Sequence, residues 1–306
     1  MIWKKLGKIF EPNNEISWMC SHAAVPFVEK LYSSYIKIYF TTRNVQNKSL
    51  IAWIIIDINN PFKIIEISSE PVLDLGAVGF FDEDGTMGCQ LIQINDKKLL
   101  YYQGWNLATS VQFRNSIGMA FFDEASKSFK KISNGPILDR SIYDNCFVAT
   151  PNVFKITDDK YLMYYLSCDE WVKKNEKLTH KYNIKIAESN DGINWIRHGK
   201  IAINYESKYE YAFSVPRVIQ ENKIYKMWYS FRASEEVETY RMGYAESING
   251  FDWSRKDNEV GIGVSSEGWD SQMICYPYIF DFEEQRYMLY NGNDYGRTGF
   301  GLAIML

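Results

Sequence analysis

Carboxylates stand at almost the same distance before several apolar runs of the chain. Asp82 and Glu210 lie six residues before the Gly or Pro that marks such a run, and Asp144 and Asp270 lie seven residues before it. Asp84 belongs to the same segment as Asp82. Carboxyl groups that a fold brings together can act as general acid and general base, or can bind a hard cation. The alternative is that each one only stabilises a turn, a position that Asp favours.

A second set of candidates consists of arginines and aromatic side chains near the ends of other apolar runs. A guanidinium group can neutralise a carboxylate or hold an anionic ligand through paired hydrogen bonds. Flat aromatic faces suit the stacking of sugar rings, although in a chain with 16% aromatic residues they also serve for packing. The candidate binding residues, including polar residues of the same loops, are Arg43, Trp105, Arg217, Arg232, Asp270, Asn293 and Arg297.

A repeat of about 61 residues determines which elements hold these side chains. Five aromatic runs are centred on residues 39, 101, 164, 228 and 289, and so lie 62, 63, 64 and 61 positions apart. Another apolar run precedes each by about thirteen residues and carries Pro at 26, 151, 216 or 277, or Gly88 in the second unit. A polar turn separates the two runs, which is typical of a β-hairpin.

Each hairpin is followed by a third strand and a tight turn. Two of these turns nearly coincide, Ser189–Trp195 and Ser247–Trp253, and both carry the Asp-Gly or Asn-Gly pair that tight hairpins favour. About four antiparallel strands fit into each unit, and five units fill the chain. This repetition predicts an all-β, five-bladed β-propeller, with an open β-sandwich as the alternative.

The ends of the chain indicate how the ring closes. The segment Trp3–Ile9 matches Trp195–Ile201, whereas the fifth unit stops at Leu306 without a fourth strand. The N-terminal strand is therefore expected to complete the last blade and to pair its open edge. We expect one domain, residues 1–306, with blades at about 16–75, 76–138, 139–203, 204–264 and 265–306 plus 1–12. The insertion at 167–182 is interpreted as a surface excursion, with a lid as one reading.

Propeller geometry brings the candidate residues to one place. The loops that enter the innermost strands meet at one mouth of the central channel, and the loops after the second strands open on the same side. A ligand pocket is expected at that mouth. The repeat therefore predicts a collar of carboxylates there, with arginines and aromatic rings around it.

Composition excludes several classes of function. The net charge of −4 offers no basic surface for nucleic acid. No apolar run approaches the roughly 18 residues of a transmembrane helix, and the first ten residues lack the apolar core of a signal peptide. The five Cys show no metal-binding spacing. We take them as reduced thiols of a cytoplasmic protein that has neither nucleic-acid nor membrane partners.

The five units, the Pro of the inner strands and the Ser-x-Asp-Gly-x-x-Trp turn at Ser189 together resemble the five-bladed glycoside hydrolase clan. That clan contains the arabinanases and xylosidases of family 43, the invertases of family 32, the levansucrases and the mannoside phosphorylases of family 130. The turn is also similar to the sialidase Asp-box, but it is one residue shorter before the Trp. The resemblance covers the whole chain and implies a carbohydrate ligand that is cleaved or transferred at the channel mouth.

The catalytic motifs of the clan are not all present. Where the resemblance implies carboxylates on the inner strands, this chain has His22, Thr150 and Ser214 nearby. A hydrolytic pair would then have to come from the collar. Glu210 is the candidate acid, since its two Tyr neighbours are expected to raise its pKa, and Asp84 or Asp144 is the candidate base. His22 is a candidate for proton transfer, since imidazole titrates near neutrality.

Three functions remain open at this point. Glycosidase-like chemistry, in surface-polysaccharide metabolism, is favoured slightly. A second reading is a protein that binds or processes an anionic or nucleotide-linked sugar through Arg43, Arg217, Arg232 and Arg297. The third is a scaffold propeller with protein partners only. No cofactor or metal is predicted, although the collar has the hard oxygen ligands of a channel calcium ion.

Overall fold

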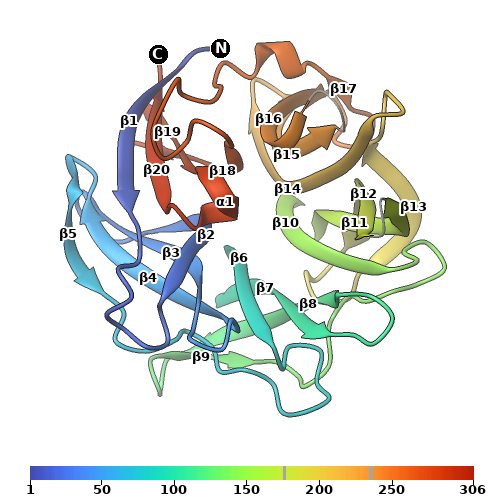
Figure 1. Ribbon diagram of the computed structural model, residues 1–306, viewed down its shortest axis with the longest axis horizontal. Helices are drawn as coiled ribbons and strands as arrows, with labels where there is room; N and C mark the ends of the chain where they lie inside the picture. The colour runs from blue at the N-terminus through green and yellow to red at the C-terminus, as the bar shows by residue number, and fades with distance from the viewer. Residues whose placement is uncertain (175–176, 234–236) are drawn as a thin grey trace.

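The computed structural model describes residues 1–174, 177–233 and 237–306. Five antiparallel blades are arranged around a central axis (Figure 1), and parallel bridges join blade I to blade II and blade III to blade IV. Blade I comprises β2 (Ser21–Lys30), β3 (Tyr35–Arg43), β4 (Ser49–Asp57) and β5 (Asn60–Ile67). Blade II comprises β6 (Gly85–Ile94), β7 (Lys97–Leu107), β8 (Phe113–Asp123) and β9 (Ser128–Lys131). Blade III comprises β10 (Phe147–Thr157), β11 (Lys160–Lys174), β12 (Lys177–Ser189) and β13 (Ile196–Ile203).

The last two blades follow the same plan. Blade IV comprises β14 (Glu210–Glu221), β15 (Ile224–Ala233), β16 (Val237–Ser247) and the short β17 (Ser254–Arg255), followed by a 3₁₀ turn at Asp257–Glu259. Blade V comprises β18 (Cys275–Phe282), β19 (Gln285–Asn291), β20 (Phe300–Met305) and, from the other end of the chain, β1 (Trp3–Phe10). The predicted five-bladed propeller and its closure by the N-terminal strand are confirmed.

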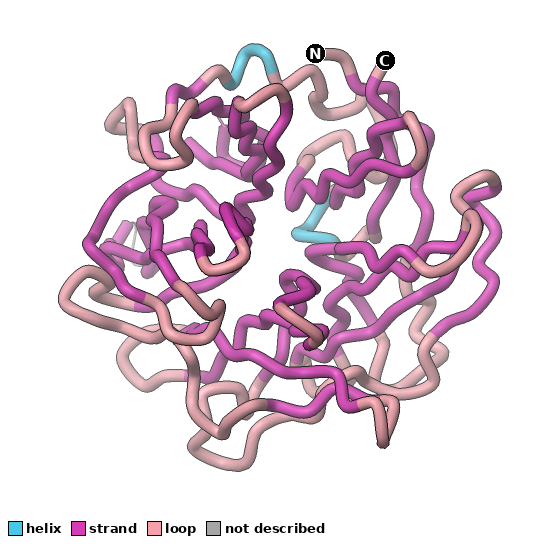
Figure 2. The backbone as a smooth tube through the Cα atoms, turned by 180° about the vertical axis from the view of Figure 1, so that it is seen from behind, coloured by secondary structure: helices cyan, strands magenta, loops and turns pink. Residues whose placement is uncertain are grey.

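Closure of the ring is an antiparallel pairing of β1 with β20. Its register runs from Trp3 opposite Met305 to Phe10 opposite Phe300. The two termini consequently lie side by side at the rim, and from behind the strands again surround one axis (Figures 1 and 2). Among the described residues, no helix has the length and apolar character that crossing a membrane requires. The cytoplasmic location stays a prediction.

Packing between blades follows from the aromatic runs of the second strands. Tyr101, Tyr164 and Trp228 are fully buried. The hydroxyl of Tyr164 donates to the backbone oxygen of Gly250, at 2.9 Å, in the tight turn of the next blade. The hydroxyl of Tyr101 makes the same contact with Gly192. Each repeated turn is therefore an anchor between neighbouring blades, which is why its sequence recurs.

The Pro of the inner strands marks a bulge that shapes the channel. The residue before each Pro has a positive φ: Val25, Thr150, Val215 and Tyr276. The pairing of the first and second strands shifts register at the same places. Positive φ is rare for β-branched residues and costs conformational energy, so the surrounding sheet must enforce it. All four residues line the pocket described below.

The insertion of blade III is a regular hairpin rather than an irregular excursion. It prolongs β11 and β12, whose pairing continues from Cys168 opposite Tyr182 to Lys174 opposite Lys177. The Trp171 ring contacts the rings of Phe147 and His180 near the base of this extension. The hairpin therefore builds one wall of the channel mouth. Residues 175–176 lie outside the described residues, so the lid reading stays a prediction.

Candidate functional site

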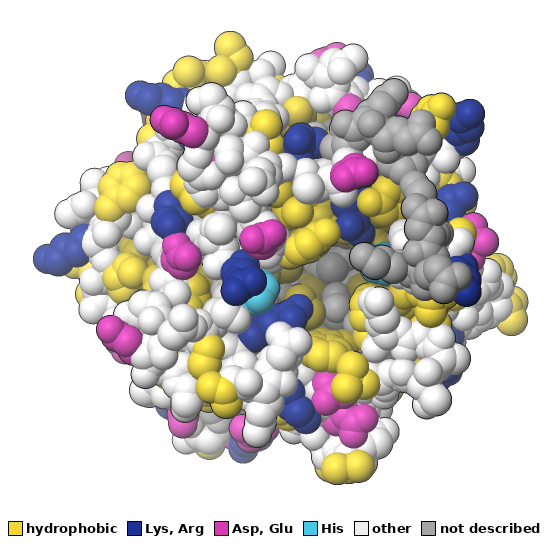
Figure 3. Space-filling model, viewed as in Figure 1, with side chains coloured by type: hydrophobic (Ala, Val, Ile, Leu, Met, Phe, Trp, Pro, Cys, Tyr) yellow, Lys and Arg dark blue, Asp and Glu magenta, His cyan; other side chains and the backbone are white. Residues whose placement is uncertain are grey.

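A pocket of about 240 Å³ opens at the mouth of the channel. The bulged residues before the inner-strand Pro line this pocket, together with Ser214. The hairpins β11–β12 of blade III and β15–β16 of blade IV contribute the rest of the wall described here: His180, Tyr182, Arg232 and Tyr240. In the space-filling view, basic side chains and a histidine border the central hollow (Figure 3). Among the described residues, no Asp or Glu lines this pocket.

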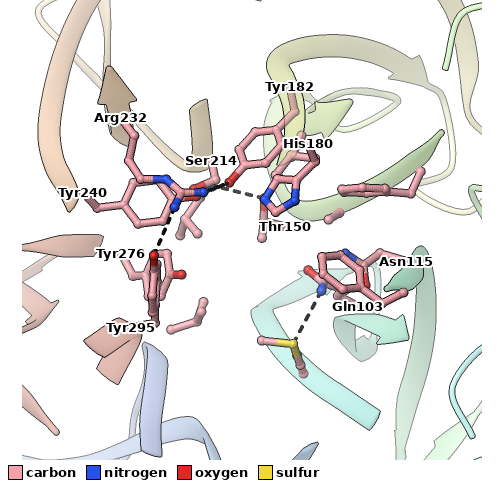
Figure 4. A pocket seen from close by; sticks show the side chains of 17 residues that line it. Gln103, Asn115, Thr150, His180, Tyr182, Ser214, Arg232, Tyr240, Tyr276 and Tyr295 are labelled. Atoms are coloured by element: carbon pink, nitrogen blue, oxygen red, sulfur yellow. Dashed lines mark hydrogen bonds between the residues drawn. The ribbon is translucent and has the colours of Figure 1, made fainter. Parts of the chain in front are cut away.

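Arg232 is the charged residue of the pocket wall. Its guanidinium lies over the ring of Tyr240, 4.6 Å from the centroid, and over that of Tyr211 at 5.1 Å. Its terminal nitrogens donate to the hydroxyls of Tyr295 at 3.0 Å and Tyr182 at 3.3 Å (Figure 4). Its Nε is buried without a partner among the described residues. Tyrosines therefore orient the guanidinium and leave its charge without a carboxylate in the described lining.

Tyr295 reaches Arg232 from an unusual backbone turn. The short element α1 (Asn293–Gly296) carries Asp294 and Tyr295 at φ values of 55° and 57°, in the left-handed region. Two successive residues of this kind are strained, and such strain often accumulates at binding sites. Here it places the Tyr295 ring edge-on against Tyr240, with centroids 5.9 Å apart, and the hydroxyl within reach of Arg232.

His180 stands against the pocket as a neutral imidazole. Burial, assisted by the charge of Arg232, lowers its pKa to about 4. Its ring stacks on that of Tyr182, with centroids 5.0 Å apart, and its Nδ1 has no partner among the described residues. The hydroxyl of Ser214, 3% exposed, also lacks a described partner. Unpaired buried polar groups of this kind are uncommon in native proteins and indicate the place of a ligand or water.

A second space of about 310 Å³ adjoins the first. Arg43 and Trp105 line it, and it shares Gln103, Asn115 and Phe113 with the first pocket. The structure therefore brings three of the predicted binding residues, Arg43, Trp105 and Arg232, to one continuous depression.

His22 lies beside these residues, but its predicted titration near neutrality is wrong. Burial, together with the charges of Arg43 and Arg297, lowers the pKa of His22 to about 4, with Asp294 acting in the opposite direction. Its Nδ1 lies 2.9 Å from the Ser21 hydroxyl. At neutral pH the imidazole is uncharged. It therefore keeps one N–H that donates a hydrogen bond and one nitrogen that accepts one, but it lacks the extra proton of a general acid.

The predicted collar is present as a repeated structural motif, but it does not face the pocket. In each of blades II to V the carboxylate lies inside the blade, bound to a cation from the fourth strand. The pairs are Asp82 with Lys131 at 2.7 Å, Asp144 with Arg197 at 2.9 Å, Glu210 with Arg255 at 2.6 Å, and Asp270 with Lys5 at 2.6 Å. In three blades a Tyr hydroxyl of the second strand also donates to the carboxylate: Tyr102, Tyr165 and Tyr290. We call this motif the carboxylate pin.

The pKa of Glu210 shows the effect of this pairing most directly. Burial alone would raise its pKa, but hydrogen bonds from Arg255 and from the backbone N–H of Glu206 outweigh this effect and lower it. The prediction of a raised pKa is therefore wrong, because a guanidinium, rather than the flanking tyrosines, faces the carboxylate. An ionised, fully paired carboxylate is a poor proton donor. Asp144, fully buried and bonded to Ser141, Tyr165, Ser167 and Arg197, is equally unsuited to activate water.

The other predicted residues have structural partners. Asp84 forms an ion pair with Lys48 at 3.1 Å and accepts the backbone N–H of Leu107 at 2.9 Å. Asn293 accepts the backbone N–H groups of Gln272 and Met273. Neither lines the described pocket, so the structure gives both a role in holding loops together.

Arg217 lies within the channel wall instead of at the mouth. It is 3% exposed, its guanidinium lies 5.2 Å from the centroid of the Tyr278 ring, and it donates to the backbone oxygen of Cys89 at 2.6 Å. This contact joins blade IV to blade II. Arg217 lines neither of the two described spaces, and its role as a binding residue stays a prediction.

Several pocket residues were absent from the sequence prediction. The residues before the inner-strand Pro could have been identified from the sequence, because the repeat places them at equivalent positions of their units. The sequence gives no such indication for His180, Tyr182 and Tyr240. They lie on the hairpins β11–β12 and β15–β16, whose lengths do not follow the repeat. Gln103 lies two residues before Trp105 on one strand, and side chains so spaced share a face. The two-residue spacing from Trp105 could therefore have identified Gln103 as a pocket residue.

Comparison with solved structures confirms the resemblance at the level of the fold. A structure described as a glycoside hydrolase superposes with a TM-score of 0.77 at 15% identity, covering 98% of this chain and 90% of that one. A thermostable family-43 glycoside hydrolase gives 0.68 at 17% identity, covering 96% and 91%. A structure from work on the GH130 family of mannoside phosphorylases gives 0.71 at 13% identity, covering 99% and 93%.

Sequence comparison identifies relatives over the full length. No family model matches the chain. Uncharacterized protein Rv1502 of Mycobacterium tuberculosis strain H37Rv is 38% identical over 305 residues, which cover 100% of this chain and 99% of the relative. Uncharacterized protein MT1551 of strain CDC 1551 has the same identity and coverage. The chain therefore belongs to the family of these two mycobacterial proteins, and its fold is that of the five-bladed glycoside hydrolases.

Proposed function

We propose that this protein binds an acidic carbohydrate in the pocket at the channel mouth. The observation that carries the proposal is the charge of the pocket. Arg232 lines it, Arg43 lines the adjoining space, and no carboxylate lines either of them among the described residues. A partly buried guanidinium with a spare N–H is suited to the carboxylate or phosphate of a ligand.

The remaining lining supports a sugar as the carrier of that anion. Tyr182, Tyr240 and Tyr276 provide rings with apolar faces, and Ser214 and Thr150 provide hydroxyls at the floor. Ligand pockets combine mostly apolar walls with a few polar groups that fix orientation. The likeness of the fold to glycoside hydrolases supports a sugar ligand by analogy.

Glycosidase chemistry by a carboxylate pair has little support from the geometry. Such hydrolysis needs one carboxylic acid and one carboxylate on either side of the glycosidic bond. The predicted pair, Glu210 with Asp84 or Asp144, is occupied by Arg255, Lys48 and Arg197. We therefore favour binding or processing of an acidic sugar over two-carboxylate hydrolysis.

Binding of acidic and neutral monosaccharides would test the proposal. Glucuronic and galacturonic acids are expected to raise the melting temperature, whereas glucose and galactose are not, because only the acids can pair with Arg232. Loss of a charged hydrogen bond costs about 1.5–3 kcal/mol, so Arg232→Ala should weaken binding of the acids by roughly 10- to 100-fold in calorimetry. The affinity of Arg232→Lys for the acids should lie between those of the unchanged protein and Arg232→Ala, because lysine keeps the charge but lacks the planar pair of donors.

Arg140→Ala is the matched control, because Arg140 is an exposed arginine that lines neither space. It should bind the acids like the unchanged protein. Equal binding of acidic and neutral sugars, or full binding by a folded Arg232→Ala variant, would refute the proposed function.

A further inference from the structure

Two amides that line the depression have few hydrogen-bond partners within the described part of the protein. Gln103 and Asn115 are each 7% exposed. The amide nitrogen of Gln103 contacts the sulfur of Met87 at 3.4 Å, a weak acceptor, and Asn115 has no side-chain hydrogen bond among the described residues (Figure 4). Neither amide is among the enclosed side-chain atoms of the described residues that lack a partner, so both remain accessible from the depression. Accessible amides can donate to and accept from the hydroxyl groups of a ligand. A ligand that supplies hydroxyl groups would satisfy both.

These amides share one face of blade II with an aromatic ring. Trp105 stands opposite Asn115 in the pairing of β7 with β8, and Gln103 lies two residues before Trp105 on β7. Residues in register on neighbouring strands, and residues two apart on one strand, point to the same side of a sheet. Trp105, Gln103 and Asn115 therefore form one continuous surface, which we call the blade II platform.

The absence of a side chain at Gly85 leaves room for the Trp105 ring. A Cβ atom at Gly85, opposite Trp105 on β6, would come within 1.9 Å of the indole nitrogen. The ring therefore lies directly against the backbone of Gly85, a position that a side chain there would block. Packing of this kind holds an aromatic surface at fixed orientation, which lowers the entropy lost when a ligand binds.

The platform lies where the two spaces meet. Gln103 and Asn115 line both the 240 Å³ pocket and the 310 Å³ space, whereas Trp105 and the exposed Leu107 line only the second. In Figure 4 the two amides lie across the pocket from Arg232 and Tyr182. A ligand held at Arg232 and extended by one sugar residue would therefore reach the platform.

We propose that the blade II platform is a second sugar subsite, and that the ligand is an acidic oligosaccharide of at least two residues. This inference rests on the proposed function. The acidic residue pairs with Arg232, while the next residue places its apolar face on Trp105 and its hydroxyls on Gln103 and Asn115. Aromatic faces and amides together match the apolar faces and hydroxyl groups of a pyranose ring.

The experiment compares each acidic monosaccharide with a disaccharide that contains it. Galacturonic acid is paired with digalacturonic acid, and glucuronic acid with cellobiouronic acid, and each dissociation constant is measured by calorimetry. At least one disaccharide should bind tenfold or more tightly than its monosaccharide. Trp105→Ala should remove this gain and change monosaccharide binding by less than twofold. Asn115→Ala should weaken the disaccharide alone, and Trp105→Phe should restore most of the gain.

Controls separate this inference from the proposed function. Trp53→Ala removes a half-buried indole of blade I that lines neither space, and it should leave both constants unchanged. Arg232→Ala should weaken monosaccharide and disaccharide alike. Disaccharides that bind no more tightly than monosaccharides, or a gain that survives in folded Trp105→Ala, would overturn the second subsite alone. Absence of binding by every acidic sugar would refute the proposed function, and the subsite with it.

Discussion

At the scale of single residues, burial decides which side chains can do chemistry at the mouth. Both His22 and His180 have a pKa of about 4, because burial and nearby arginines disfavour the protonated form. Glu210 remains ionised because Arg255 is its partner. The titratable groups near the mouth therefore keep fixed charges at neutral pH, and Arg232 supplies the positive charge that a ligand meets.

A pH dependence of stability follows from His180. Its pKa is about 4 in the folded protein and 6.5 in the reference state, so the unfolded chain binds the proton more readily between these values. Stability is therefore lost as the pH falls from 6.5 towards 4, with about 2 kcal/mol lost between pH 7 and pH 5 on account of this residue. Urea unfolding at the two pH values should show a much smaller loss for His180→Phe, since the phenyl ring suits the surrounding aromatic side chains.

His198→Phe is the control for that measurement, because His198 is exposed on β13. It should keep the full pH dependence. A His180→Phe variant that loses as much stability between pH 7 and pH 5 as the unchanged protein would contradict the assignment.

At the scale of elements, the carboxylate pin links the inner end of a blade to its outermost strand. Its carboxylate comes from the loop before the first strand or, in blade IV, from the first residue of that strand. Its cation comes from the fourth strand and, in three blades, a hydroxyl comes from the second strand. The fourth strand is the outermost and the least covered of each blade, so an ion pair to the interior fixes it there. The collar thus serves the stability of blades II to V, which explains its regular recurrence.

Removing a pin should destabilise the protein strongly. Asp144→Asn leaves Arg197 without its carboxylate, and breaking a buried pair costs about 3–5 kcal/mol. Urea unfolding should show a loss in that range. Glu124→Gln breaks the pair with Lys127, whose side chains are more than 70% exposed, and should cost less than about 1 kcal/mol. A similar small loss for Asp144→Asn would show that the pin does not stabilise the blade.

At the scale of the whole molecule, stability depends on joining the two ends of the chain. Trp3 on β1 is 5% exposed and packs edge-on against Trp228 of blade IV, with ring centroids 6.2 Å apart. Lys5 on the same strand pins Asp270 of blade V. The N-terminal strand therefore contacts two blades whose other strands come from the last third of the sequence. Without it, the edge of β20 would be open to pairing with other chains.

Truncating Trp3 should weaken the closure without removing the strand. Loss of a buried aromatic side chain costs about 3–5 kcal/mol, so Trp3→Ala should lower the unfolding free energy by that amount. Tyr32→Ala in the turn between β2 and β3, where the residue is 73% exposed, is the control and should change it by less than about 0.5 kcal/mol. Equal effects of the two substitutions would argue against a dominant role for the closure.

The sequence by itself determined the ring. Three local patterns indicate the ring: the spacing of the aromatic runs, the Pro of the inner strands and the match of Trp3–Ile9 with Trp195–Ile201. These patterns repeat because equivalent strands of each blade pack against equivalent neighbours. The same repeat placed Arg43, Trp105 and Arg232 near one mouth, which the structure shows. It also located the carboxylates in equivalent loops.

Only the tertiary structure decided which side those carboxylates face. Lys5 binds Asp270 across 265 positions of the sequence, and Arg255 binds Glu210 across 45, so no local pattern reveals that the acids are already paired. The pocket itself depends on the lengths of two hairpins that depart from the repeat and bring His180 and Arg232 together. Local spacing specifies strands and turns, whereas the charge of a site depends on which distant partners the packing supplies.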